Sequence, residues 1–199
     1  MTRLVLFLAA AFVLAGCASS NYPMAPAKAA VADYKYIIGP GDSVNIIVWR
    51  NPELSMSVPV RPDGKLTSPL IEDLVAMGKN PSDLAREIEV QLKKFIQDPV
   101  VTVIVGGFVG PYSEQIRIVG AATRPTALPY KQNMTILDAM IAVGGITEYA
   151  AGNRAVLIRT ADSGKQYTLR LKDLLKTGDV SANADLRPGD VIIIPEGWF

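Results

Sequence analysis

One turn-and-strand pattern occurs twice in this chain, and it constrains the fold more than any other feature. Pro40-Gly41-Asp42 precedes the aliphatic run 43–48, and Pro188-Gly189-Asp190 precedes the run 191–194. Proline presets the first central φ of a tight turn, glycine accepts the positive φ of the second, and aspartate can bond nearby backbone N–H groups. The β-branched runs predict a strand after each turn. We therefore expect two separately folded domains.

A cluster of chain breakers, Gly106-Gly107-Phe108-Val109-Gly110-Pro111, separates two blocks of regular pattern. In the first block, 34–110, we predict strands at 43–48, 55–60 and 100–105. The strand at 55–60 is placed at a sheet edge because Pro59 cannot donate to a ladder. The dense β-branched run at 100–105 is typical of a buried strand.

A helix in the first block is predicted to begin at Asn80 and to end at Pro99. Asn80 can cap it and Pro81 suits its first turn. The apolar residues Leu84, Ile88, Leu92 and Phe95 would share one helical face. The charged residues between them favour a solvated face with i,i+4 pairs such as Glu89–Lys93.

The second block, 111–199, predicts a mixed sheet around one helix. Strands are expected at 116–119, 126–130 and 190–194, and a hairpin around the turn 162–164. The helix would begin at Thr135 in a capping box completed by Asp138, and stop at Gly144-Gly145. This order corresponds to a β-grasp arrangement, so the fold class of the whole chain is α+β.

Composition excludes several functions. The 20 Lys and Arg against 19 Asp and Glu give no basic excess for a nucleic-acid partner. The absence of histidine removes the commonest general base and metal ligand, and a lone cysteine, Cys17, excludes intramolecular disulfides and cysteine zinc sites. We see no nucleophile–base pair and no phosphate loop, so we expect no catalytic, cofactor or metal residues. Paired carboxylates leave a glycosidase site open, because their separation is unknown.

The first residues predict a lipoprotein signal. Arg3 is followed by an apolar run from Leu4 to Ala15, which is shorter than the roughly 20 residues a spanning helix needs. The run ends in Leu14-Ala15-Gly16-Cys17, which resembles the lipobox of bacterial lipoproteins. The resemblance implies cleavage of the signal peptide 1–16 and attachment of acyl chains such as palmitate to Cys17. Residues 17–33 are rich in Ala, Ser and Pro and are predicted to form a flexible tether.

Together these segments resemble the bacterial outer-membrane polysaccharide export family. The first block is similar to its export domain through YKYIIGPGDSVNIIVW (34–49), PELSMSVPVRPDGKLTSPLI (52–71) and DPVVTVIV (98–105). The second is similar to its soluble-ligand-binding β-grasp domain through IRIVGAATRPTALPY (116–130), TILDAMIAVGGIT (135–147) and LRPGDVIIIP (186–195). The resemblance implies a periplasm-facing, lipid-anchored subunit of the outer membrane. A homo-oligomeric ring, with eight copies as one option, would let the polysaccharide chain pass without any bond being made or broken.

The family also implies partners. An inner-membrane chain-length regulator, linked to a tyrosine kinase, would meet the ring across the periplasm. The best-known members carry further β-grasp copies and a C-terminal membrane-spanning helix, whereas one β-grasp domain is expected here, so a separate outer-membrane channel protein is expected. Trp198 and Phe199 would then pack on their own domain or dock on a partner or lipid.

Two other functions stay open at this point, and the residues of the three turns are assigned structural roles. The chain could be a monomeric periplasmic glycan-binding lipoprotein, or an enzyme that modifies polysaccharide. Asp42 and Asp190 are expected to hold their turns rather than to bind sugar, and Arg61-Pro62-Asp63-Gly64 is expected to be a turn first and a subunit contact second.

Overall fold

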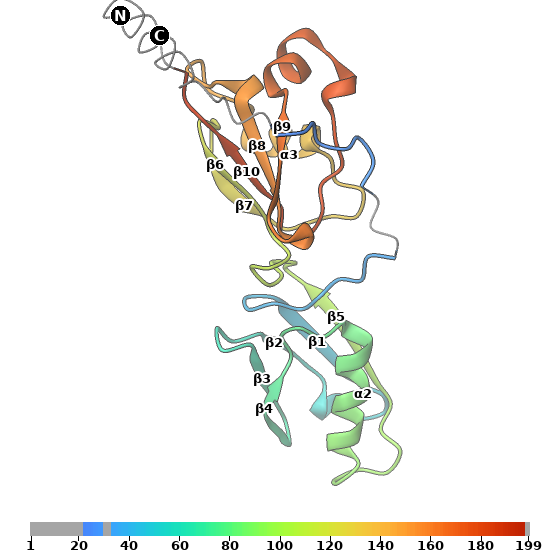
Figure 1. The fold of residues 1–199 in the computed structure, drawn as a ribbon. Coiled ribbons are helices and arrows are strands. Elements are labelled where there is room, and N and C mark those ends of the chain that lie inside the picture. The colour runs from blue at the N-terminus through green and yellow to red at the C-terminus, as the bar shows by residue number, and fades with distance from the viewer. Residues whose placement is uncertain (1–21, 30–32, 198–199) are drawn as a thin grey trace, which may run out of the picture.

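The computed structural model describes residues 22–29 and 33–197 and forms two domains, each with its own hydrophobic core. Figure 1 shows the two domains end to end, with the first one below. The first contains β1 to β5 and α2, and the second contains β6 to β10 and α3. The α+β fold class predicted from the sequence is confirmed.

The first domain is built on a three-stranded antiparallel sheet. Its strands are β1 (Ser43–Val48), β2 (Met56–Pro59) and β5 (Val101–Gly106), in the order β2-β1-β5. A separate hairpin joins β3 (Lys65–Ser68) to β4 (Ile71–Val75). The sheet's inner side chains pack with those of α2 (Pro81–Leu92) and the hairpin in one core. As predicted, β2 lies at an edge.

The predicted turn at 61–64 joins β2 to β3. The backbone N–H of Gly64 donates to the carbonyl of Arg61, and the N–H of Arg61 donates to the carbonyl of Lys65, both at 2.9 Å. The turn is therefore confirmed, although β3 pairs with β4 and not with β2. The Arg61 guanidinium pairs with the carboxylates of Asp63 and Asp73 at the surface.

The start of α2 agrees with the sequence and its end does not. The side chain of Asn80 accepts a 2.9 Å hydrogen bond from the N–H of Asp83, as a cap should. The helix stops at Leu92, before Pro99. Phe95 therefore leaves the apolar face and is 56% exposed. The prediction that Phe95 is a core residue of this helix is wrong, because the helix ends at Leu92 and it is Ile96, not Phe95, that packs against the core beyond that point.

The predicted buried strand at 100–105 is β5, and it is only half buried. Val101 is buried, whereas Ile104 is 51% exposed. Helix α2 covers one face of the sheet, and β5 has β1 as its single neighbour, so alternate side chains point to solvent. Glu89 does not pair with Lys93 as expected: its carboxylate accepts from the N–H of Val101 at 2.9 Å and pairs with Arg86 at 2.8 Å.

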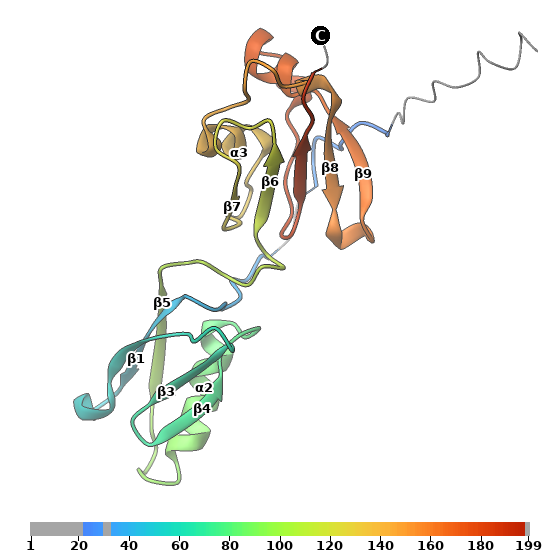
Figure 2. The ribbon, with the colours of Figure 1, turned by 90° about the vertical axis from the view of Figure 1, so that its left-hand side faces the viewer.

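The second domain is a five-stranded mixed sheet with one helix. Its strands run in the order β7-β6-β10-β8-β9 (Figure 2). Their bounds are β6 (Ile116–Gly120), β7 (Thr126–Leu128), β8 (Ala155–Arg159), β9 (Lys165–Leu169) and β10 (Val191–Ile194). Strands β10 and β6 are parallel and the other pairs antiparallel. The arrangement agrees with the predicted β-grasp.

Helix α3 (Ile136–Val143) begins in the predicted capping box. The N–H of Thr135 donates to Asp138 at 2.9 Å, and the side chain of Thr135 accepts from the N–H of Asp138. Gly144 ends the helix with φ +78°, a left-handed conformation that glycine adopts without steric cost. Ile136, Ala139, Met140 and Val143 point into the core of the domain.

Residues 22–29 are the main difference from the sequence analysis. They were expected to belong to a flexible tether, but they lie extended against the second domain, seen as the blue segment beside β9 in Figure 1. Thr168 of β9 donates to the carbonyls of Pro23 and Tyr22, at 2.8 and 2.9 Å. Ala29 is buried, its N–H donating to Asp185 at 3.0 Å and its carbonyl accepting from Arg187 at 3.2 Å. Ala25 packs against the core of the second domain, so the segment is held by that domain although it precedes the first domain in the chain.

Candidate functional site

The residue predicted to carry lipid lies outside the described part of the chain. Cys17 is within residues 1–21, and Trp198 and Phe199 are also outside the described residues. Within 22–29 and 33–197, no helix has the length and apolar character needed to cross a bilayer. No cluster of acidic side chains suited to a metal ion occurs in the same residues.

Asp42 is a buried acceptor that joins its own turn to the segment leading to the second domain. Its side chain is 0% exposed. One carboxylate oxygen accepts from the phenol of Tyr36 at 2.7 Å and the N–H of Gly39 at 2.9 Å. The other accepts from the N–H groups of Val109 and Gly110, at 2.6 and 3.0 Å. Every acceptor position is used internally, so this carboxylate cannot bind sugar.

The electrostatics around Asp42 agree with that structural role. Burial raises the pKa of the Tyr36 phenol well above its ordinary value, and the hydrogen bond it donates to Asp42 raises this pKa further. The Tyr36 ring also meets Phe108 edge-on, with centroids 5.3 Å apart. The phenol therefore stays a neutral donor at physiological pH.

Asp190 holds the second turn in the same way but with fewer partners. It accepts from the N–H of Arg187 at 2.9 Å, the equivalent of the Gly39 bond to Asp42. The buried Arg159 lies 3.5 Å away and donates at 2.9 Å to the carbonyl of Asp185. Burial raises the pKa of Asp190, and the hydrogen bond from Arg187 and the long contact with Arg159 only partly oppose this. Both aspartates are structural, as the sequence predicted.

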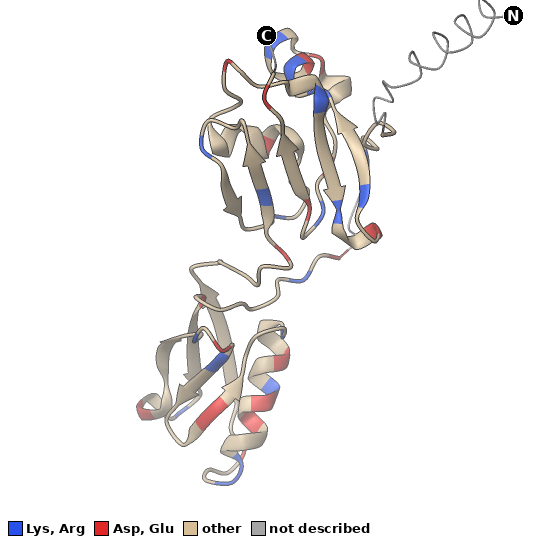
Figure 3. Cartoon of the chain, turned by 60° about the vertical axis from the view of Figure 1, so that its left-hand side comes forward, with Lys and Arg blue, Asp and Glu red and all other residues tan. Residues whose placement is uncertain are grey.

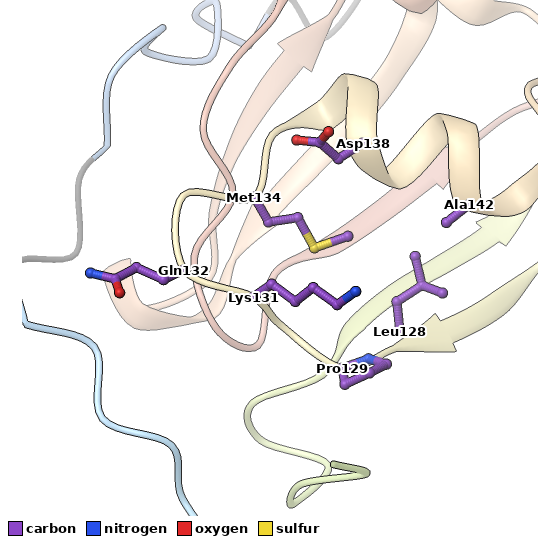
Figure 4. Close-up of a pocket in the computed structure, with 7 residues that line it drawn as sticks. All are labelled: Leu128, Pro129, Lys131, Gln132, Met134, Asp138 and Ala142. Atoms are coloured by element: carbon purple, nitrogen blue, oxygen red, sulfur yellow. The ribbon is translucent and has the colours of Figure 1, made fainter. Parts of the chain in front are cut away.

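The second domain carries a pocket of about 420 Å³. It lies between α3 and the connection that follows β7. Figure 4 shows Ala142 on the helix above Leu128 and Pro129, and Asp138 on the same helix with its carboxylate turned toward the side of the pocket where Met134 lies. Met134 is buried, and Lys131 extends beneath it. Gln132, which also lines the rim, points away from the others.

The polar groups of this pocket are a cation and an anion that do not pair with each other. Within the described part of the chain, no carboxylate lies within ion-pair distance of Lys131. The hydroxyl and N–H of Thr135 donate to Asp138 and hold the pKa of its carboxyl below the ordinary value. Asp138 is therefore ionised at neutral pH, and it has acceptor capacity left.

The open face of the first sheet is a second surface that needs explanation. Ile47, Trp49, Val100 and Ile104 are exposed on the side away from α2, and Trp49 is 66% exposed. The backbone N–H of Trp49 donates to the carbonyl of Val100, which places these two residues next to each other at the ends of β1 and β5.

Charged residues are distributed differently from these apolar ones. Figure 3 shows acidic residues along α2 and basic residues spread over the strands of the second domain.

Sequence reasoning missed the pocket. Asp138 was predicted only as part of a cap, and Leu128, Lys131 and Met134 were not singled out. Asp138 and Ala142 are separated by one helical turn and so share a face, but the pairing of that face with residues 128–131 depends on the tertiary fold. The only local signal was Lys131, a cation just before α3 with no obvious partner nearby in the sequence.

Comparison with known proteins defines the class. Residues 30–106 match the family described as polysaccharide biosynthesis/export protein, and residues 114–194 match the SLBB domain. The fold thus corresponds to an export domain followed by an SLBB domain.

Curated relatives agree with this class. The chain is 26% identical over 200 residues to the EPS I polysaccharide export outer membrane protein EpsA of Ralstonia nicotianae, which covers 88% of this chain and 51% of the relative. It is 27% identical to the protein of the same name in Ralstonia solanacearum, covering 79% and 47%. It is also 27% identical to the exopolysaccharide production protein ExoF of Rhizobium meliloti, covering 92% and 44%.

The chain belongs to the polysaccharide export protein family. It spans about half the length of the curated relatives it matches.

Proposed function

We propose that this chain is a periplasm-facing lipoprotein subunit of the outer membrane that takes part in the export of capsular polysaccharide or exopolysaccharide. The observation that carries the proposal is the succession of an export domain and an SLBB domain in one chain, whose relatives are named as export or production proteins of exopolysaccharide. On this proposal the role is transport, and the chain has no catalytic activity of its own.

Lipid attachment at Cys17 is the proposed anchor. The support is the order of Arg3, the apolar run from Leu4 and the small residues before the cysteine. Several acyl chains on one cysteine would hold the protein firmly, since one chain alone binds a membrane only marginally. Neither Ala18 nor Ser19 is the aspartate that retains lipoproteins in the inner membrane, which supports the outer membrane as the location.

Self-association into a ring is supported by the open face of the first sheet. Ile47, Trp49, Val100 and Ile104 form an exposed apolar face of the kind that marks protein–protein contacts. A heterologous contact that closes by rotation generates a ring. The further partners on this proposal are the polysaccharide, an inner-membrane chain-length regulator with its tyrosine kinase, and a separate outer-membrane channel protein.

A deletion strain tests the proposal. Loss of the gene should stop surface polysaccharide while lipid-linked precursors are still made, and the wild-type gene supplied in trans should restore export. A Cys17→Ser variant should lose acylation, accumulate with its signal peptide uncleaved and fail to restore export. Normal surface polysaccharide in the deletion strain would rule out the proposal.

A monomeric glycan-binding lipoprotein is the second candidate, and the pocket beside α3 favours it. Light scattering on the full-length lipidated chain in detergent separates the two candidates. A single-subunit mass in detergent and in native membranes would favour the monomer, whereas a mass equal to a fixed whole number of subunits would favour the ring.

A further inference from the structure

The pocket beside α3 combines an apolar lining with charged groups on opposite walls. Leu128, Pro129, Met134 and Ala142 supply carbon atoms, and its volume of about 420 Å³ lies within the usual range for small-molecule sites. Asp138 is fixed in place by the capping box, so its carboxylate does not need to be ordered when a ligand binds. The lining is therefore amphipathic, and one of its polar groups is preorganised.

The charges of the pocket define what would complement it. Lys131 projects its ammonium group across the pocket (Figure 4), and among the described residues it has no carboxylate partner. An ammonium group offers three donors to an anion. The ionised Asp138 can accept hydrogen bonds from hydroxyl groups. The complement is a ligand with one anionic group, several hydroxyl groups and a C–H face.

We propose that this pocket binds one acidic pyranose residue of the glycuronate type. Its carboxylate would pair with Lys131, its ring hydroxyls would donate to Asp138, and its C–H face would pack on Leu128 and Met134. That the sugar belongs to an exported chain rests on the function proposed above. A phosphorylated ligand fits less well, because Lys131 is the single cation among the lining residues and Asp138 adds a negative charge.

The half-open form of the pocket suits a ligand that must leave again. A site along a transport route has to bind strongly enough to admit the ligand and weakly enough to release it. A single exposed ion pair on an apolar floor gives that kind of binding. We therefore expect dissociation constants in the millimolar range, with repeated sites adding avidity along a polymer.

Two probes that differ at one carbon test the ligand class. Binding of sodium D-glucuronate as its methyl glycoside and of methyl D-glucoside, which differ only at C6, to the full-length lipidated chain in detergent can be measured by ligand-observed NMR. Glucuronate should bind about two- to fivefold more tightly, which is the effect of one exposed ion pair. Lys131→Gln should abolish that preference and leave the weaker glucoside binding unchanged. Lys176→Gln, an exposed lysine away from the pocket, is the control and should keep the preference.

The outcomes separate this proposal from the export function. Absence of binding to both probes, or a preference for glucuronate that survives in Lys131→Gln, would overturn the pocket assignment. If the deletion strain loses export while Lys131→Gln shows neither altered binding nor altered export, the pocket assignment fails and the export function stands. If the deletion strain exports normally but glucuronate binding depends on Lys131, the export function fails and the pocket assignment stands.

Discussion

The carboxylate of Asp42 accepts a 3.0 Å hydrogen bond from the backbone N–H of Gly110, a residue 68 positions later in the chain. The turn before β1 is thereby tied to the segment that leads into the second domain. The side chain of Gln115 extends this connection, because its amide donates to the carbonyls of Val109 and Gly110, at 3.1 and 3.3 Å. One buried aspartate therefore sets how the chain leaves the first domain.

Asp42→Asn should destabilise the first domain strongly. An amide can replace only part of the acceptor capacity, so at least one of the N–H groups of Gly39, Val109 and Gly110 would be left buried without a partner. We expect a loss of about 2–3 kcal/mol in the free energy of unfolding, measured by urea denaturation. Asp98→Asn, at an exposed position with φ +47° that asparagine tolerates, should change little. Equal stability of the two variants would contradict the role assigned to Asp42.

Gly39→Ala should be more damaging than Gly78→Ala. A Cβ atom on Gly39 would lie 2.0 Å from the carbonyl carbon of Gly110, and backbone cannot move aside easily. We expect a cost of about 3 kcal/mol or more. Gly78 has φ +83° and open space around its Cβ position, so only conformational strain of about 1 kcal/mol is expected there. Thermal unfolding of both variants would show the difference, and the reverse order would be inconsistent with the close contact.

Two aspartates of the second domain should respond to pH with opposite signs. Burial raises the pKa of Asp190 above 3.8, so the folded state binds this proton more tightly and the stability from this group declines as pH rises through the raised pKa. The bonds from Thr135 lower the pKa of Asp138 below 3.8, so its contribution is present above 3.8 and lost as pH falls through the lowered pKa.

Unfolding free energies measured between pH 7 and pH 3 test these signs. Relative to Asp190→Asn, the wild type should gain stability as pH falls. Relative to Asp138→Asn, it should lose stability over the lowest part of the range. The same sign for both differences would show that one assignment of cause is incorrect.

Ala29→Asp should release the N-terminal segment from the second domain. Ala29 is buried and its backbone bonds Asp185 and Arg187, so a charged side chain there has no room and no partner. Amide exchange at Ala25 and Thr168 should accelerate, and limited proteolysis should cut within 22–33. The exposed neighbour offers a matched control, since Lys28→Asp should leave both readouts unchanged.

Trp49→Glu together with Ile104→Lys should weaken self-association without unfolding the chain. Both side chains are exposed on the open sheet face, so their replacement removes apolar contact area between copies and costs the single chain little. Native mass spectrometry of detergent-extracted particles should show smaller species. Val90→Lys, an exposed apolar position on α2, should leave the assembly intact. Unchanged particles in the double variant would place the contact elsewhere.

The parts of the fold that depend on neighbouring residues could be predicted from the sequence. The capping box of Thr135 and Asp138 requires residues three positions apart, and both turns ending in Asp42 and Asp190 are set by residues next to them. The alternation of apolar residues located β1 and β6, and the order of the motifs pointed to the family.

The remaining features depend on contacts between distant residues. The half-exposed state of β5 follows from the sheet face that α2 leaves uncovered, and its sequence alone resembles that of a strand buried on both faces. The segment 22–29 has no apolar pattern of its own, and its partner Thr168 lies 146 residues from Tyr22. The pocket is likewise formed by two walls that only the fold brings together.

The attachment of Tyr22 to β9 has a consequence for how the molecule would stand at a membrane. The carbonyl of Tyr22 accepts from Thr168, and residues 18–21 alone separate it from Cys17. A fully extended chain covers about 17 Å over that stretch. If Cys17 carries the proposed lipid, the edge of the second domain is therefore held close to the bilayer surface. The export domain, at the other end of the molecule, would then project away from the lipid toward the opposite membrane.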